Sequence, residues 1–190
     1  CTKEYTISKM PAENITLYAK WEINQYTISF NTLGGNVIDS ITQNYNTSVT
    51  QPENPSRVGY TFDGWYSDRS CSIEYTFSNM PAENITLFAG WTLNSYSISF
   101  NVDGGSEVAP IKQDYNTSLT KPNNPSKLGY SFAGWYLDEE CKIAYTFPST
   151  MPAENISLYA KWEINQYTIS FNTNGGSDVA PITLDYNSSL

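Results

Sequence analysis

The sequence contains no histidine, few cations and only three cysteines. Histidine is the commonest general base, nucleophile activator and metal ligand, so its absence excludes Ser-His-Asp and Cys-His catalysis. Ten lysines and arginines stand against 19 carboxylates, and the resulting net charge of −9 argues against nucleic acid as a partner. No apolar run approaches the roughly 20 residues that span a bilayer. We therefore expect a chain with no catalytic residues, no cofactor and no membrane insertion in this segment.

The three cysteines stand about 70 residues apart, at Cys1, Cys71 and Cys141. This spacing fits no zinc-ligand pattern, so we expect no metal site. Equivalent atoms of successive units of this size lie on the order of 30 Å apart, whereas a disulfide requires Cα atoms within about 7 Å. We expect small, partly buried thiols, with bridges between chains as the alternative.

The cysteine interval belongs to a repeat that runs through the whole sequence. "GYTFDGWYSDRSC" (59–71) returns as "GYSFAGWYLDEEC" (129–141), and "MPAEN" begins at Met10, Met80 and Met151. We expect the chain to be a segment of a longer array. These landmarks divide it into the C-terminal part of a truncated repeat (1–21), two complete repeats (22–91 and 92–162) and the N-terminal part of a truncated repeat (163–190).

Each repeat opens with strict alternation of apolar and polar residues, as in "YTISF" (26–30), which predicts a half-buried strand. A Gly-Gly pair follows, at Gly34-Gly35 in the first complete repeat, and it predicts a tight hairpin with positive φ angles. The returning strand is expected over 37–45. Pro110 and Pro181 fall in its copies, and because proline cannot donate to a ladder, this strand is expected at a sheet edge or bulge.

The second half of each repeat is also expected to be rich in β-structure. Prolines in the segment 47–58 leave room for no more than a short helical turn. Gly64 predicts a bulge or a close approach, 75–77 a short strand, and 85–91 a last alternating strand. The fold class is therefore mainly β, α+β at most, in tandem units of about 70 residues with little helix.

The residues that are identical between repeats are those that a small core requires. Charged positions differ between repeats; Asp63, for example, corresponds to Ala133. Tyr18, Phe88 and Tyr159 fall out of phase on the last strand. They are candidates for an exposed contact surface, with packing between units as the alternative. The expected core residues are Tyr26, Ile28, Phe30, Tyr60, Phe62, Trp65, Leu87, Trp91, Tyr96, Ile98, Phe100, Tyr130, Phe132, Trp135, Leu158 and Trp162.

Only four residues, 92–95, connect Trp91 to the next repeat at Tyr96. This connector contains neither glycine nor proline and has an apolar residue, Leu93, able to pack at an interface. A short connector of this composition restricts relative motion more than a Gly/Ser linker does. We predict that successive repeats form a stiff array.

"GYTFDGWY" and "MPAENITLFAGW", after an alternating aromatic strand and a Gly-Gly turn, resemble the Listeria–Bacteroides repeat, present as B-repeats in internalin-type surface proteins. The resemblance covers both complete repeats and both flanks. It implies a β-grasp-like unit, secretion, and a place in long repetitive bacterial surface proteins that act in adhesion or as stalks. A β-grasp unit usually carries a helix, and the proline-rich segment departs from that pattern.

Three functional hypotheses follow. The first is a stiff, non-catalytic extracellular spacer, stalk or fibre on a bacterial cell surface, whose partners are neighbouring repeats of the same chain. The second is an adhesin module that binds a host surface protein or glycan multivalently. The third is a self-assembling extracellular filament or sheath subunit with contacts through edge strands. Six N-x-[ST] sequons are glycan acceptors or simple turn residues, at Asn14, Asn46, Asn84, Asn116, Asn155 and Asn187.

Overall fold

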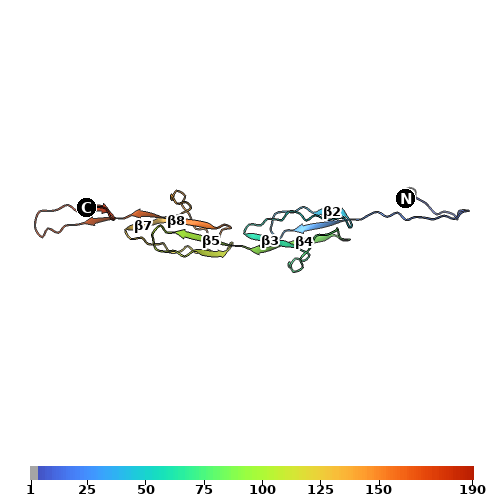
Figure 1. The fold of residues 1–190 in the computed structure, drawn as a ribbon, viewed down its shortest axis with the longest axis horizontal. Helices are drawn as coiled ribbons and strands as arrows, with labels where there is room; N and C mark the ends of the chain where they lie inside the picture. Colours follow the sequence, from blue (N-terminus) through green and yellow to red (C-terminus); the bar gives the residue numbers. More distant parts are fainter. Residues whose placement is uncertain (1–3) are drawn as a thin grey trace. The chain divides into compact units, whose positions relative to one another are not determined.

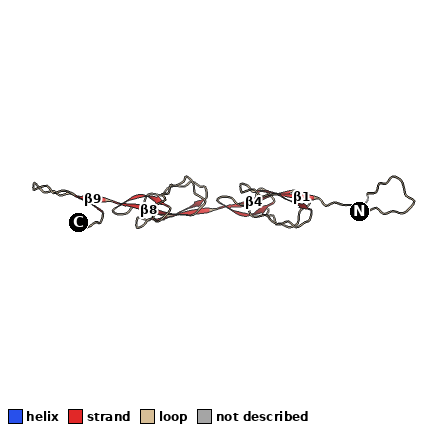
Figure 2. Ribbon diagram, turned by 90° about the horizontal axis from the view of Figure 1, so that it is seen from above, coloured by secondary structure: helices blue, strands red, loops and turns tan. Residues whose placement is uncertain are grey.

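The protein is described by a computed structural model that covers residues 4–190; Cys1 lies outside the described residues. This part of the chain contains strands and loops and no helix (Figure 2). The chain forms two compact units. Unit 1 runs to Arg57 and continues over Phe62–Trp91, and unit 2 comprises Val58–Thr61 and Thr92–Leu190.

The first complete repeat forms a four-stranded sheet in the order β2-β1-β4-β3 (Figure 1). Strand β1 changes partner along its length, pairing antiparallel with β2 up to Ile28 and parallel with β4 from Ile28 onward. The parallel pair β1-β4 therefore lies at the centre of the sheet. The strands are β1 (Gln25–Asn31), β2 (Ile41–Asn44), β3 (Tyr60–Tyr66) and β4 (Ile85–Leu93).

The second complete repeat forms the same sheet, in the order β6-β5-β8-β7, and a separate two-stranded sheet follows. The mainly β prediction for tandem, similar units is confirmed. The strands are β5 (Ser95–Asn101), β6 (Ile111–Asp114), β7 (Tyr130–Tyr136), β8 (Ile156–Ile164), β9 (Gln166–Ile169) and β10 (Ile182–Asp185).

One buried cluster lies against one face of each four-stranded sheet, because alternate residues of the central strands point to the same side. Full burial of such a side chain contributes about 1.5–3 kcal/mol. The cluster of unit 1 is Ile28, Val49, Trp65, Met80, Leu87 and Ala89, and that of unit 2 is Ile98, Leu119, Trp135, Met151, Ile156, Leu158 and Ala160.

The proline-rich segment 47–58 contains no helix, and apart from bridge residues at 48 and 57 and a turn at 58 it has no regular secondary structure. Its first residues bond to the segment around Met80: the amide of Val49 donates to Ser78 O at 2.8 Å, and that of Met80 donates to Thr47 O at 2.8 Å. These hydrogen bonds use backbone groups that a helix would need, and the prolines have no amide N–H to donate to a helix.

The Gly-Gly pair does not form a tight hairpin, since nine residues separate Asn31 from Ile41. Positive φ angles occur at Leu33 (48°) and Gly34 (101°) and not at the second glycine. That glycine, Gly35, is needed for space: a Cβ there would lie 2.7 Å from the indole of Trp91. One glycine of the pair therefore serves the turn, and the other admits the tryptophan.

The expected strand at 75–77 is absent from the described structure of either complete repeat. This segment instead makes single contacts, with a bridge between Tyr66 and Glu74 and a 2.7 Å bond from the Tyr75 amide to Trp65 O. The predicted bulge is confirmed in the second repeat, where the β7-β8 register shifts between Phe132 and Gly134. Pairing resumes beyond the shift, from Gly134 opposite Lys161 to Tyr136 opposite Tyr159.

Candidate functional site

Most of the expected core residues lie in or against the two buried clusters. Tyr60 and Tyr130 differ: they are half-buried and belong to neither cluster. Both occur at the start of an outer strand, β3 or β7, and pack against a tyrosine of the following repeat. They mark the joints between repeats. The buried residues are Ile28, Trp65, Leu87, Ile98, Trp135 and Leu158, and those packed against the clusters are Tyr26, Phe30, Phe62, Trp91, Tyr96, Phe100, Phe132 and Trp162.

The first joint lies within unit 2, where Tyr115 packs on Gly59 and Tyr60. Gly59 has φ +78°, and the ring of Tyr115 fills the space that a Cβ at this position would need. The rings of Tyr60 and Tyr115 meet edge to face, with centroids 6.3 Å apart. A side chain larger than hydrogen at position 59 would overlap the ring, so glycine is required here for both φ and space.

Asn94 connects the same groups through hydrogen bonds. Its amide donates to Gly59 O at 3.0 Å, and its carbonyl accepts from the Tyr115 amide at 2.9 Å. Its side-chain Oδ1 accepts from the hydroxyl of Thr61 at 2.7 Å. One connector residue thus bonds both to the start of β3 and to the segment after β6, and we call the group Gly59, Tyr60, Thr61, Asn94 and Tyr115 the joint clasp.

The clasp is repeated with the same atoms after the second complete repeat. The ring of Tyr186 fills the space at Gly129, which has φ +78°, and lies 6.2 Å from the ring of Tyr130. Asn165 donates from its amide to Gly129 O at 2.8 Å and accepts from the Tyr186 amide at 2.8 Å and the Ser131 hydroxyl at 2.6 Å. Two independent copies of one geometry indicate that the clasp is a regular feature of the repeat.

Sequence reasoning missed the central residues of the clasp. The alternating pattern of the strands does not single out Tyr115 or Asn94, although tyrosine recurs at 45, 115 and 186, and asparagine at 24, 94 and 165. Their recurrence on turns and connectors, outside the alternating strands, was the available signal.

A loop organised around an aspartate follows β3 in the first complete repeat and β7 in the second. The carboxylate of Asp68 accepts bonds from the hydroxyl of Ser70, from Ser72 and from the amide of Ile73 at 2.8 Å. These bonds, that of Ser70 foremost, lower the pKa of Asp68 to about 2 from an ordinary value of 3.8. Hydrogen bonds from the backbone amides of Lys142 and Ile143 likewise lower the pKa of Asp138. The carboxylate therefore organises the loop and is a poor proton donor.

The cysteine of this loop is a partly buried thiol in each repeat. Cys71 and Cys141 are free in the structure and have positive φ angles of 53° and 51°. The thiol of Cys71 lies 3.7 Å from Ala89 O, to which it donates. Burial, followed by the charge of Asp68, raises the pKa of Cys71, so neither the helix dipole nor the cationic setting that activates cysteines operates here.

A hollow of about 580 Å³ lies on unit 2, and Lys127, Lys161, Cys141 and Tyr159 are among its lining residues. Lys127 is already engaged, since it donates to Asp103 O at 2.6 Å and lies 5.7 Å from the ring centroid of Trp162. Lys161 lies over the ring of Tyr136. These cations hold the turn and the aromatic side chains of their own repeat.

The three candidates for an exposed contact differ in exposure. Tyr18 is 78% exposed. Phe88 and Tyr159 are half-buried at equivalent positions of β4 and β8. The sequon asparagines have structural roles: the Oδ1 atoms of Asn84 and Asn155 accept from strand amides at 2.8 and 2.9 Å, and others take positive φ at turns.

Within residues 4–190, no group of three or more Cys, Asp or Glu side chains is placed to hold a metal ion. The same residues contain no helix long and apolar enough to cross a membrane. The side chains described above pack the core of each repeat or form the joint clasp.

Tandem, similar, mainly β repeats with the clasp at two equivalent positions define a β-rich repeat protein. The chain belongs to the Listeria-Bacteroides repeat family, whose sequence profile matches residues 26–90 and 96–161. The resemblance seen in the sequence is thereby confirmed, internalin-type repeats included.

Three relatives match over most of the chain. Two are from Evansella cellulosilytica: one named "Putative membrane protein", 43% identical over 93% of this chain, and one named "Putative Gly-rich membrane protein", 40% identical over 94%. Internalin H of Listeria monocytogenes is 39% identical over 66% of this chain. The chain spans only 27%, 21% and 23% of the length of these relatives.

Proposed function

We propose that this chain is a stiff, non-catalytic spacer segment of a secreted bacterial cell-surface protein. The observation that carries the proposal is the joint clasp, which occurs after each complete repeat. A flexible connector would have Gly/Ser composition and few contacts. The connector residue Asn94 instead makes four hydrogen bonds, three of them within the clasp, and the ring of Tyr115 covers the glycine of the preceding repeat.

Strand continuity supports the same proposal. Strand β3 begins at Tyr60 in unit 2 and continues from Phe62 in unit 1, and β4 runs from unit 1 past Trp91 into unit 2. Two strands of one sheet therefore have residues in both units. Opening the clasp requires breaking its hydrogen bonds, each worth about 0.5–1.5 kcal/mol.

The surface location rests on the family and on the names of the relatives. Internalin H carries similar repeats, and two further relatives are named as membrane proteins. A spacer needs no catalytic group, and the described residues show engaged cations and a carboxylate held ionised by its own loop. The neighbouring repeats of the chain are its partners in this role.

Residual dipolar couplings test stiffness directly, because they report the orientation of each unit. We expect the two units of the wild-type chain to fit a single alignment tensor, and Gly59→Ala to require two. Gly175→Ala is the matched control, since Gly175 also has a positive φ (94°) but nothing lies within 4 Å of its Cβ position. Separate tensors in the wild type would refute the spacer.

One observation favours the adhesin alternative. Apolar residues are exposed at equivalent positions of both repeats: Ile73 is 61% and Ile143 58% exposed, and Val58 and Leu128 are 70% and 81% exposed. Ile73 stands on the loop fixed by Asp68. A panel of host extracellular proteins and glycans tests this function: saturable micromolar binding, lost on Ile73→Ser with Ile143→Ser but kept with the exposed strand variant Thr86→Ala, would place the adhesin first.

A further inference from the structure

The first and the last strand of each complete repeat are parallel neighbours at the centre of the sheet. In the first repeat, β1 pairs with β4 over four residue pairs, from Ile28 opposite Ile85 to Asn31 opposite Phe88. Strands β5 and β8 pair in the same register in the second repeat. The chain therefore enters each repeat through one central strand and leaves it through the other.

This arrangement decides how a repeat responds to tension along the chain. Parallel strands start at the same end of a sheet, so a pull on the start of β1 and on the end of β4 slides the two strands past each other. The hydrogen bonds between them then carry the load together, each worth about 0.5–1.5 kcal/mol. In contrast, an antiparallel hairpin that is pulled at its open end loses its hydrogen bonds one after another.

A tryptophan connects the end of the last strand to the turn after the first strand. The Nε1 atom of Trp91 donates to Thr32 O at 2.8 Å, and a Cβ at Gly35 would lie 2.7 Å from its indole. In the second repeat, the Nε1 atom of Trp162 donates to Val102 O at 3.0 Å. Sliding of β4 along β1 breaks this hydrogen bond and draws the indole out of the space beside the glycine.

An asparagine connects the same two strands at the other end of the parallel pairing. The Oδ1 atom of Asn84 accepts from the amide of Thr27 at 2.8 Å. The Oδ1 atom of Asn155 accepts from the amide of Ser97 at 2.9 Å in the second repeat. Side-chain hydrogen bonds therefore lie at both ends of the parallel ladder, and we call the ladder with these two bonds the tension clamp.

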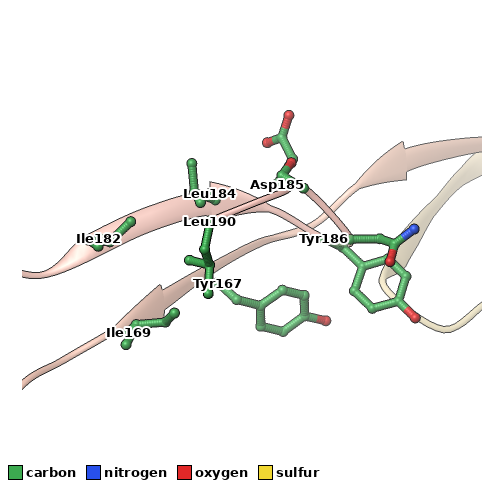
Figure 3. A pocket seen from close by; sticks show the side chains of 9 residues that line it. Tyr167, Ile169, Ile182, Leu184, Asp185, Tyr186 and Leu190 are labelled. Atoms are coloured by element: carbon green, nitrogen blue, oxygen red, sulfur yellow. The ribbon is translucent and has the colours of Figure 1, made fainter.

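The parallel strand also buries the isoleucine at the centre of the first strand. Ile28 and Ile98 are completely buried. The β9-β10 hairpin has the antiparallel pairing of β1-β2 and no parallel neighbour, and Ile169, at the position of Ile28, is 41% exposed beside a hollow of about 310 Å³ (Figure 3). Separation of β1 from β4 exposes similar apolar surface to water, which adds to the resistance of the clamp.

We propose that each complete repeat bears load, with the tension clamp as the part that resists extension of the chain. A protein that is fixed at one end and bound at the other meets this load whenever its partner is pulled away. The proposal goes beyond the spacer function, because stiffness depends on the joints, whereas each clamp lies inside a single unit. An array with flexible joints can still resist tension, and a stiff array can still unravel, so the two proposals fail independently.

Single-molecule force spectroscopy of the chain of residues 1–190, pulled from its two ends, provides the main test. We expect two major unfolding events, one for each complete repeat. Each event should release somewhat less than the ~230–250 Å that about 70 extended residues span. Forced unfolding measures the unfolding rate under load, so it reports the clamp directly.

The reference is the first repeat pulled in a different direction. Handles at Gln25→Cys and Asn44→Cys, with the native cysteines replaced by serine, peel β1 from β2 at the open end of their antiparallel pair. The force needed for this opening should be less than about half of that needed from the two ends, because the bonds break in sequence. Equal forces in the two directions would overturn the proposal.

Matched tryptophan variants separate resistance to force from equilibrium stability. At constant force Trp91→Phe should raise the unfolding rate of the first repeat roughly fivefold, while the second repeat keeps its rate. Trp65 lies on β3, outside the clamp, and its Nε1 atom has no hydrogen-bond partner within residues 4–190. Because Trp65 is 2% exposed and Trp91 is half-buried, Trp65→Phe should lower the urea midpoint more and accelerate forced unfolding less. The reverse order of forced unfolding rates would contradict the clamp.

Matched asparagine variants give a second measurement that does not depend on the engineered handles. Asn84→Ala removes the bond to the Thr27 amide and should also accelerate unfolding at constant force by roughly fivefold. Asn36 is the control, since its Oδ1 atom accepts from the amide of Ser56 at 2.5 Å, outside the clamp, and Asn36→Ala should leave the rate unchanged. If Asn84→Ala and Asn36→Ala change the rate equally, the parallel strands are not the part that resists extension.

Discussion

The ring of Tyr115 lies where a side chain at Gly59 would begin, and the ring of Tyr186 does the same at Gly129. Each tyrosine ring therefore packs against a glycine that lies more than fifty residues earlier in the sequence. Partial burial of Tyr115 and Tyr186 accompanies this contact, whereas Tyr45 is 49% exposed. The clasp has consequences for stability that can be measured.

Gly59→Ala should destabilise unit 2 by about 3 kcal/mol, because it adds left-handed strain to an overlap with the ring. Gly175→Ala should cost about 1 kcal/mol, since strain acts there without a ring. Urea unfolding followed by tryptophan fluorescence measures both. In a Tyr115→Ala background the Gly59→Ala penalty should fall to that of the control, and an unchanged penalty would contradict the clasp.

Leu87→Ala should destabilise the first repeat by about 3 kcal/mol, because Leu87 is completely buried at the centre of its cluster. The exposed neighbour Thr86→Ala should change stability by less than about 0.5 kcal/mol. Hydrogen exchange adds a test of coupling: the Asn94 amide, bonded to Gly59 O, should lose protection in Leu87→Ala as well. Full protection there would mean that the repeats unfold independently.

Lowering the pH should loosen the Asp68 loop. The pKa of Asp68 is about 2 in the folded chain and 3.8 ordinarily, so the folded state binds the proton less readily. Its contribution to stability is complete above about pH 4 and is lost as pH falls through about 2. NMR shifts of the Ser72 and Ile73 amides should follow this titration. In Asp68→Asn the shifts of these two amides should not change with pH in this range. A titration midpoint near pH 4 in the wild type would contradict the lowered pKa of Asp68.

Alkylation of Cys71 and Cys141 at pH 8 should be several-fold slower in the folded chain than in urea, because burial raises the pKa of both thiols. Peptide mass spectrometry separates the two sites. Asp68→Asn should speed the alkylation of Cys71, because the charge of Asp68 helps to raise the pKa of this thiol. The alkylation rate of Cys141 should not change, so Cys141 is the internal control. Equal rates in folded and unfolded chains would contradict this environment.

The sequence predicted the parts of the fold that depend on periodicity and local sterics. Alternation at 26–30 indicated β1, and the bulge predicted at Gly64 is present at the equivalent glycine of the second repeat, Gly134. The strand expected at 75–77 did not form because a strand needs a neighbour to pair with, and this segment has only the single bridge between Tyr66 and Glu74 beside it. The local sequence pattern does not show which segment will lie beside a strand.

The candidate site was harder to predict for the same reason. Tyr60 was expected in the core from its alternation with Phe62, yet it faces a ring 55 residues later in the chain. Gly35 was expected to serve the turn and instead admits Trp91. Both outcomes depend on contacts between distant segments.

The direction of the clasp bears on how such a gene can change. Tyr115 and Tyr186 each contact a glycine of the preceding repeat, so unequal recombination at two matching codons would remove or duplicate a whole period and still leave a tyrosine against each such glycine. The number of repeats can then change without creating a mismatched junction, and under the proposed spacer role the length of the spacer would be an inherited variable.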